Sequence, residues 1–183
     1  GVMHGYMKIP ELKRVCHAME ISINEYLVSV YIWSVYTECL HGMPSKCPIR
    51  VAVPVNLRPY FNSITTKNFF VMVSAEFHPT KETYTFAEVA AIVKESLRSQ
   101  INRENLEKLF SYNVSNEKLL IARVVPLFLK NLAMKYVYTT SALANTATIT
   151  NIGNISVTEE YRPYVEMFHA FLAMSKGQHL KGT

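Results

Sequence analysis

The sequence has 183 residues, of which 49% are apolar and 18% charged, with a net charge of +5 at pH 7. This length suits one well-buried domain, and the apolar, aromatic-rich composition excludes a disordered chain. We therefore treat residues 1–183 as a single ordered domain. The low share of charged residues has two explanations that stay open: an apolar core, or apolar surface that a partner covers.

The basic residues form three loose clusters, at residues 8–14, 130–135 and 176–181. None of them has the run of basic residues interleaved with aromatic residues that is typical of nucleic-acid binding, so we expect no nucleic-acid partner. The positive balance fits either a solvated surface or a substrate that carries phosphates.

The three cysteines, Cys16, Cys39 and Cys47, are odd in number and form no C-x-x-C pair. This disfavours a disulfide framework and favours a reducing cytoplasm. His41 lies between two of them, but three ligands without a fourth make a poor metal site, so we expect no metal. Polar residues interrupt the apolar stretch 21–40, which predicts a buried helix and no membrane span.

Hydrophobic periodicity and two capping boxes, Ser22 with Glu25 and Thr85 with Glu88, predict the helices. Their expected ranges are 12–19, 22–41, 86–101, 103–120 and 126–138. Alternating or short apolar runs predict strands over 49–57, 69–77, 146–152, 155–157 and 165–173. Because proline cannot donate a backbone hydrogen bond, Pro54 places the first strand at a sheet edge or at a bulge. The pattern predicts a layered α/β or α+β domain.

Few residues are suited to acid–base chemistry at neutral pH. Nucleophile-elbow and phosphate-loop motifs are absent from the sequence, and all fourteen acidic residues are glutamates. His17 and His169 lie within apolar patterns, which predicts core or interface positions for both. The histidines are His4, His17, His41, His78, His169 and His179.

Two polar stretches invite a functional interpretation. In the first, Asn56 and Arg58 end a strand that proline then turns, and Asn68 precedes the next strand. These residues either face a ligand or fix the loop through backbone carbonyls. In the second, Thr150 and Asn151 could project into a cavity while Gly153 allows close backbone approach. The alternative for this stretch is a plain β-turn.

Four segments together resemble one protein family. They are V-P-V-N-L-R-P-Y-F at 53–61, N-F-F at 68–70, P-L-F-L-K-N at 126–131 and T-N-I-G-N-I at 150–155. In this order they are similar to the C-terminal half of bacterial alcohol acetyltransferase-like proteins. Those belong to the superfamily of chloramphenicol acetyltransferase, plant acyltransferases and condensation domains. The resemblance covers about residues 8–171, including the helix pair that precedes the first strand.

The resemblance implies a chloramphenicol acetyltransferase-like half with a mixed sheet packed by helices. In the family, two halves enclose a channel in which an acyl group passes from coenzyme A or a carrier thioester to an alcohol or amine. A histidine of an H-H-x-x-x-D-G motif on the N-terminal half acts as general base. No cofactor is held permanently.

A chain without aspartate cannot contain that motif, so the resemblance implies that its main partner is an N-terminal half of the same protein. It also implies a small-molecule acyl acceptor and no catalytic residue in this chain. The positions that it assigns to the channel wall are Asn56, Arg58, Asn68, Thr150, Asn151 and Gly153.

Two alternatives remain at this stage. The first is a non-catalytic module of the same fold that self-associates as a homodimer through its apolar surface. The second is an unrelated α/β enzyme that uses His78 or His169. It would need a pocket at one of these histidines and a carboxylate, such as Glu76, within hydrogen-bond reach.

Overall fold

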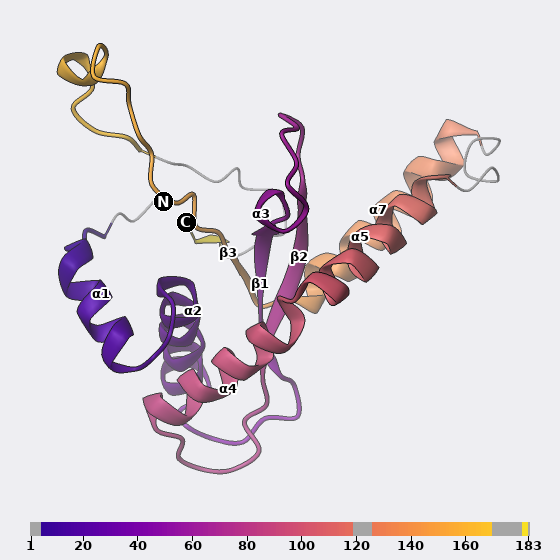
Figure 1. The fold of residues 1–183 in the computed structure, drawn as a ribbon. Helices are drawn as coiled ribbons and strands as arrows, with labels where there is room; N and C mark the ends of the chain where they lie inside the picture. The colour runs from indigo at the N-terminus through magenta and orange to yellow at the C-terminus, as the bar shows by residue number, and fades with distance from the viewer. Residues whose placement is uncertain (1–4, 119–125, 170–180, 183) are drawn as a thin grey trace.

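The computed structural model describes residues 5–118, 126–169 and 181–182. Its strands form a mixed sheet in the order β2-β1-β3-β4, and helices pack against the sheet (Figure 1). This confirms the layered α/β fold that the sequence predicts. The strands are β1 (Ile49–Asn56), β2 (Phe70–Phe77), β3 (Ala147–Ile149) and β4 (Lys181–Gly182). The helices are α1 (Ile9–Ala18), α2 (Ile23–Ser34), α3 (Arg58–Phe61), α4 (Phe86–Gln100), α5 (Arg103–Lys118) and α7 (Leu127–Ala144), with a π-helical turn η1 (Val35–Cys39) and a 3-10 turn η2 (Arg162–Tyr164).

Both expected capping boxes are present and begin the two helices that cover the sheet. At the start of α2, Ser22 N–H donates to Glu25 Oε2 (2.6 Å) and Glu25 N–H donates to Ser22 Oγ (3.2 Å). The same reciprocal pair joins Thr85 and Glu88 at the start of α4. Each box satisfies two backbone donors that the first helical turn leaves free.

The antiparallel pairing of β1 and β2 is the longest ladder of the sheet. It runs without interruption from Ile49 opposite Phe77 to Asn56 opposite Phe70. Side chains alternate between the two faces of a strand, so the odd-numbered residues of both strands share one face. That face carries the main core.

The position of β1 corrects the expectation for Pro54. β1 is an inner strand, and the unbroken register leaves no bulge. Leu57 N–H donates to Phe69 O, so Leu57 and Phe69 form a hydrogen-bonded pair of the ladder. Because such pairs alternate along an antiparallel ladder, the odd-numbered residues of β1 point their N–H groups toward β2, and the nitrogen of Pro54 faces away from β2. On that side, the β3 ladder pairs only with Val51 and Ala52. The missing N–H of Pro54 therefore interrupts no ladder bond.

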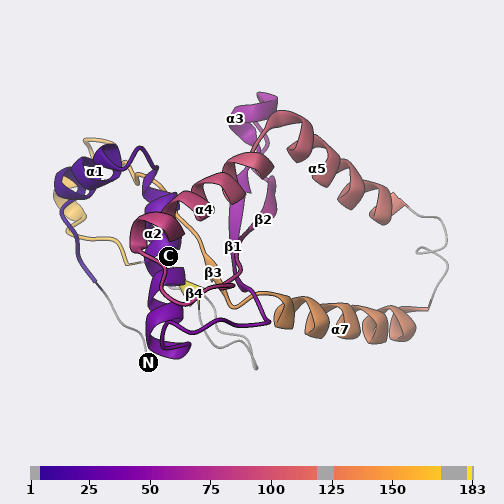
Figure 2. The same ribbon diagram turned by 90° about the horizontal axis from the view of Figure 1, so that it is seen from below.

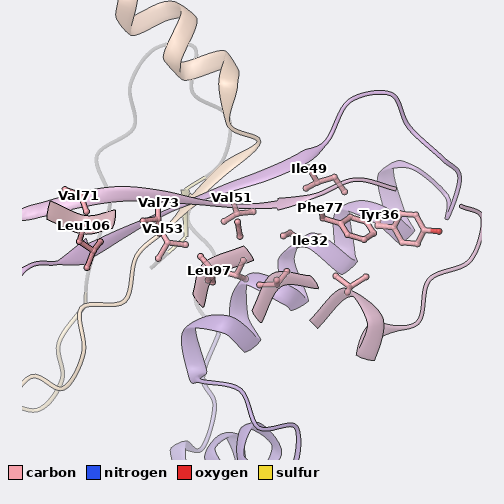
Figure 3. Close-up of a cluster of buried hydrophobic side chains, with 14 of the residues drawn as sticks. Ile32, Tyr36, Ile49, Val51, Val53, Val71, Val73, Phe77, Leu97 and Leu106 are labelled. Carbon is pink, nitrogen blue, oxygen red and sulfur yellow. The ribbon is translucent and has the colours of Figure 1, made fainter. Parts of the chain in front are cut away.

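The core lies between the odd-numbered face of the sheet and the helices. Figure 3 shows Ile32 and Tyr36 from the second helix and its π-helical turn, and Leu97 from α4, against strand valines such as Val51. At the other end of the cluster, Leu106 of α5 lies near Val71 and is fully buried (Figure 3). A smaller cluster of Leu12, Cys16, Ile21 and Ala90 attaches α1 to the body.

The outer edge of β2 is covered by side chains from the C-terminal end of α4. Ser74 N–H donates to Gln100 Oε1 (3.4 Å), and Gln100 Nε2 donates to Ser74 O (2.9 Å). Glu76 N–H donates to Ser96 Oγ (3.2 Å). These side chains take the place of a neighbouring strand along this part of the edge.

The C-terminal third departs most from expectation. β3 is shorter than the expected strand 146–152, and residues 155–157 form no strand. Residues 165–169 are also irregular, while the rest of the expected strand 165–173 lies outside the described residues. A strand needs a partner ladder, and short apolar runs do not reveal whether one is available. α7 begins at Leu127, one residue after the expected start at 126, and extends six residues beyond Tyr138. Its apolar side chains, such as Leu132 and Tyr136, are exposed.

Among the helices that the structure describes, none combines the length and the apolar character required to cross a lipid bilayer.

Glu25 joins α2 to α4 by accepting hydrogen bonds from Arg98 Nε (2.8 Å) and Nη2 (3.2 Å). Burial acts to raise the pKa of this carboxyl, but the bonds from Arg98 and Ser22 outweigh it and hold the pKa below its usual value of 4.5. A carboxyl with a lowered pKa stabilises the folded state when the pH is above the pKa of the same group in the unfolded chain. This stabilisation is lost as the pH falls through the pKa of the folded state.

We expect Glu25→Gln to lower the free energy of unfolding by about 1 to 3 kcal/mol at pH 7, because two charge-assisted bonds are weakened. The difference from the wild type should shrink as pH falls below about 4.5, where the wild-type carboxyl becomes protonated. Denaturant unfolding at several pH values measures both effects. Glu95→Gln, at an exposed position of α4, is the control and should change little. A pH-independent loss in Glu25→Gln would contradict the assignment.

Candidate functional site

Five of the six wall positions suggested by the sequence line one open hollow. It has a volume of about 540 Å³ and lies over the end of β1, the start of β2 and the segment that follows β3. Gly153 is not among its lining residues. The hollow is lined by Pro54, Asn56, Arg58, Asn68, Phe69, Phe70, Met72, Thr148, Thr150 and Asn151.

Strand alternation explains why most of these residues meet. Pro54 lies opposite Met72, and Asn56 lies opposite Phe70, so all four are on the face opposite the core. Thr148 continues this face, because β3 pairs in register with β1 at Ala52 and Thr148. Pro54, Phe70 and Met72 form the apolar floor of the hollow and were not expected there, although their alternation with the core residues of β1 and β2 places them on the same face as Asn56.

Arg58 fixes the loop at the rim of the hollow. Its Nε donates to Thr65 O (2.9 Å), Nη2 to Lys67 O (2.6 Å) and Nη1 to Asn56 Oδ1 (3.2 Å). The planar guanidinium suits several acceptors at fixed angles. For Arg58, the interpretation as a loop-fixing residue is therefore confirmed.

Asn68 behaves differently from Arg58. Its side chain is exposed, and within the described part of the chain no hydrogen bond to it is present. The expected bond from Asn68 to a backbone carbonyl is therefore not formed. Asn68 lines the hollow, and within the described part of the chain its amide has both donor and acceptor capacity unused.

Asn151 and Gly153 form a turn at the other rim. Asn151 Oδ1 accepts from Gly153 N–H (2.8 Å), and Asn151 Nδ2 donates to Asn24 Oδ1 at the start of α2 (2.8 Å). Gly153 has a φ of +80°, a left-handed conformation that favours glycine. A side chain there would meet nothing within 4 Å, so close backbone approach does not explain this glycine. The side chain of Asn151 closes the bend at Gly153, and among the described residues no backbone hydrogen bond forms the plain β-turn that was the alternative.

The chemistry of the hollow is neutral and hydrogen-bonding above an apolar floor. Among the described residues of its lining, Arg58 is the one that is charged, and its Nε and Nη2 already donate to carbonyls of the loop. Phe70 and Met72 are 49% and 44% exposed and form apolar surface next to the amide of Asn68 and the hydroxyl of Thr150. Such a surface can hold an uncharged polar group, but the residues of the lining that the structure describes include no carboxylate and no histidine.

A separate polar cluster lies at the opposite end of the β1–β2 ladder. Glu76 Oε1 accepts from Arg50 Nη2 and from His78 Nε2, both at 2.7 Å. The bond from Arg50 is the main cause that holds the pKa of Glu76 below its usual value, and the bond from His78 adds to this effect. The alternative hypothesis of an enzyme that uses His78 required a carboxylate within hydrogen-bond reach, and Glu76 meets this condition. It also required a pocket at His78, and the hollow described above does not reach this residue. Opposite charges at paired strand positions could have indicated the contact between Arg50 and Glu76.

The other two histidines of interest correct the sequence interpretation. His17 and His169 are both exposed, so neither is a core residue, while an interface position for them stays a prediction. Among the described residues, no group of three or more His, Cys or acidic side chains could hold a metal ion.

Comparisons with protein families, curated proteins and solved structures found no match to this chain.

We expect Arg58→Lys to destabilise the loop 58–67 although it keeps the charge, because one ammonium group cannot replace three fixed donors. The free energy of unfolding should fall by about 1 to 2 kcal/mol, and amide hydrogen exchange should accelerate in this loop. Arg14→Lys, at an exposed position of α1, is the matched control. Unchanged exchange in Arg58→Lys would contradict the role of Arg58 as a loop-fixing residue.

Proposed function

We propose that this chain forms one wall of an acyl-transfer channel. In the proposed reaction, an acyl group such as acetyl moves from coenzyme A or a carrier thioester to an alcohol or amine. The observation that carries the proposal is the hollow, in which Asn56, Arg58, Asn68, Thr150 and Asn151 come together from three separate segments. These residues belong to the motifs on which the family resemblance rests.

The chemistry of the hollow supports a positioning role. The hydroxyl or amine of the acceptor attacks the thioester carbonyl, a base removes the proton of the acceptor, and the thiolate leaves. Neutral donors such as Asn68 and Thr150 can orient the thioester and stabilise negative charge on its oxygen. Since none of the described residues that line the hollow is a base and the chain contains no aspartate, we propose that an N-terminal half of the same protein supplies the histidine.

The proposed compartment is the cytoplasm, where acyl thioesters of coenzyme A are available as co-substrates. All three cysteines are free thiols, which suits a reducing compartment.

The proposal predicts that acetyl-CoA binds in the hollow of the isolated chain. Amide chemical shifts recorded during a titration should change at Asn56, Asn68 and Thr150. Thr150→Leu fills the hollow and should weaken binding about tenfold, which corresponds to roughly 1.4 kcal/mol. Thr158→Leu, at an exposed position outside the hollow, is the control. Shift changes confined to other surfaces would contradict the proposed site.

The proposal also predicts that the isolated chain transfers no acyl group. Incubated with acetyl-CoA and simple alcohols or amines, it should release free thiol no faster than a heat-treated sample, because the general base is missing. A thiol-reactive dye measures this release. Turnover that survives purification would contradict the assignment of the base to another half.

A further inference from the structure

Helix α7 exposes an apolar surface without cover from the described parts of the chain. Between Leu127 and Thr140, every side chain is exposed except Lys130. Leu132 is 67% exposed and Tyr136 71%, and both line a shallow hollow of about 580 Å³ along the helix. α5 and α7 overlap in Figure 1 but diverge in Figure 2, so α5 does not cover this surface. A helix of this kind is normally stabilised by packing its apolar face.

A second exposed surface lies on residues 155–168, at the opposite side of the molecule in both views (Figures 1 and 2). Tyr161 is 58% exposed, Tyr164 86% and Phe168 52%. Next to them is a hollow of about 350 Å³, whose lining includes Val157. The segment thus combines large apolar side chains with a recess that can receive one.

The two surfaces have opposite charges. α7 carries Lys130 and Lys135 and no acidic residue, whereas segment 155–168 carries Glu159, Glu160 and Glu166 against the single basic residue Arg162. In the described regions, none of these side chains takes part in an ion pair. Opposite charges at the rims of two apolar surfaces favour contact between them and set its register.

The accessible area fits burial of these surfaces in an assembly. The chain exposes 14,064 Å², whereas a compact monomer of 20.9 kDa exposes about 9,000 Å². The difference is roughly 5,000 Å² per chain, whereas the about 2,000 to 5,000 Å² that obligate dimers bury is shared between two chains, so a dimer would cover about half of this excess or less.

We propose that two copies of this chain form a two-fold symmetric dimer in which α7 of each copy packs against segment 155–168 of the other. In a two-fold symmetric dimer, the contact of α7 of the first copy with segment 155–168 of the second is repeated by α7 of the second copy and segment 155–168 of the first. Because the two surfaces lie at opposite ends of each chain, the closed dimer requires the two copies to run antiparallel side by side; a head-to-tail contact would leave one surface of each end copy uncovered.

Sedimentation of the full chain between 1 and 100 µM tests the proposal; these concentrations are about those that separate weak from stable association. We expect a dimer, and we expect Leu132→Glu to weaken it at least about tenfold because a charge would be placed in the contact. Leu109→Glu, at an exposed position of α5, is the matched control and should leave the dimer intact. Circular dichroism verifies that both variants are folded.

A charge exchange tests whether the two surfaces contact each other. Lys130→Glu with Lys135→Glu should weaken the dimer, and so should Glu159→Lys with Glu160→Lys. The combination of all four should restore affinity to within about threefold of wild type, since attraction returns with reversed signs. Restoration supports the pairing, and failure to restore overturns it.

Three further results would overturn the proposal. One is a monomer at every concentration tested. Another is a dimer that Leu132→Glu leaves unchanged, which would place the contact elsewhere. The third is a monomer whose α7 becomes protected from hydrogen exchange on vesicles of anionic phospholipid, which would identify a membrane surface as the occupant.

Discussion

The eight-residue ladder between β1 and β2 determines where the main parts of this molecule lie. Because the register is unbroken, every odd-numbered side chain of the pair faces the helices and every even-numbered one faces the opposite side. A slip by one residue would move Val51 and Val53 into solvent and Pro54 and Asn56 into the core. The core and the hollow are therefore two consequences of one register, and neither could shift without the other.

The elements that the sequence predicted well are those with strong local signals. Ser22 with Glu25 and Thr85 with Glu88 determine the starts of α2 and α4 through contacts within four residues. The expected strand at 155–157 failed because a strand depends on a ladder to a distant segment, and no local pattern shows whether one is present. Pro54 was misplaced for the same reason: its tolerance depends on where β3 ends.

The candidate site was predictable in part. Asn56 ends a strand of clear alternation and Arg58 follows it two residues later, so their position at the sheet end followed from the sequence. The role of Arg58 in fixing the loop did not follow from the sequence, because it depends on the carbonyls of Thr65 and Lys67, which only the folded loop brings within hydrogen-bond distance. Gly153 joined the predicted set through its motif, but its conformation is explained by the turn with Asn151.

The cover that α4 provides for the edge of β2 limits how the sheet can grow. At Ser74, the amide of Gln100 occupies both the donor and the acceptor that an incoming strand would need. Exposed strand edges are where β-proteins begin to aggregate, and natural sequences block them. Here one glutamine and one serine prevent strand addition over the central part of this edge. The chain can therefore expose large apolar side chains on other surfaces without also offering that stretch of backbone to fibre growth.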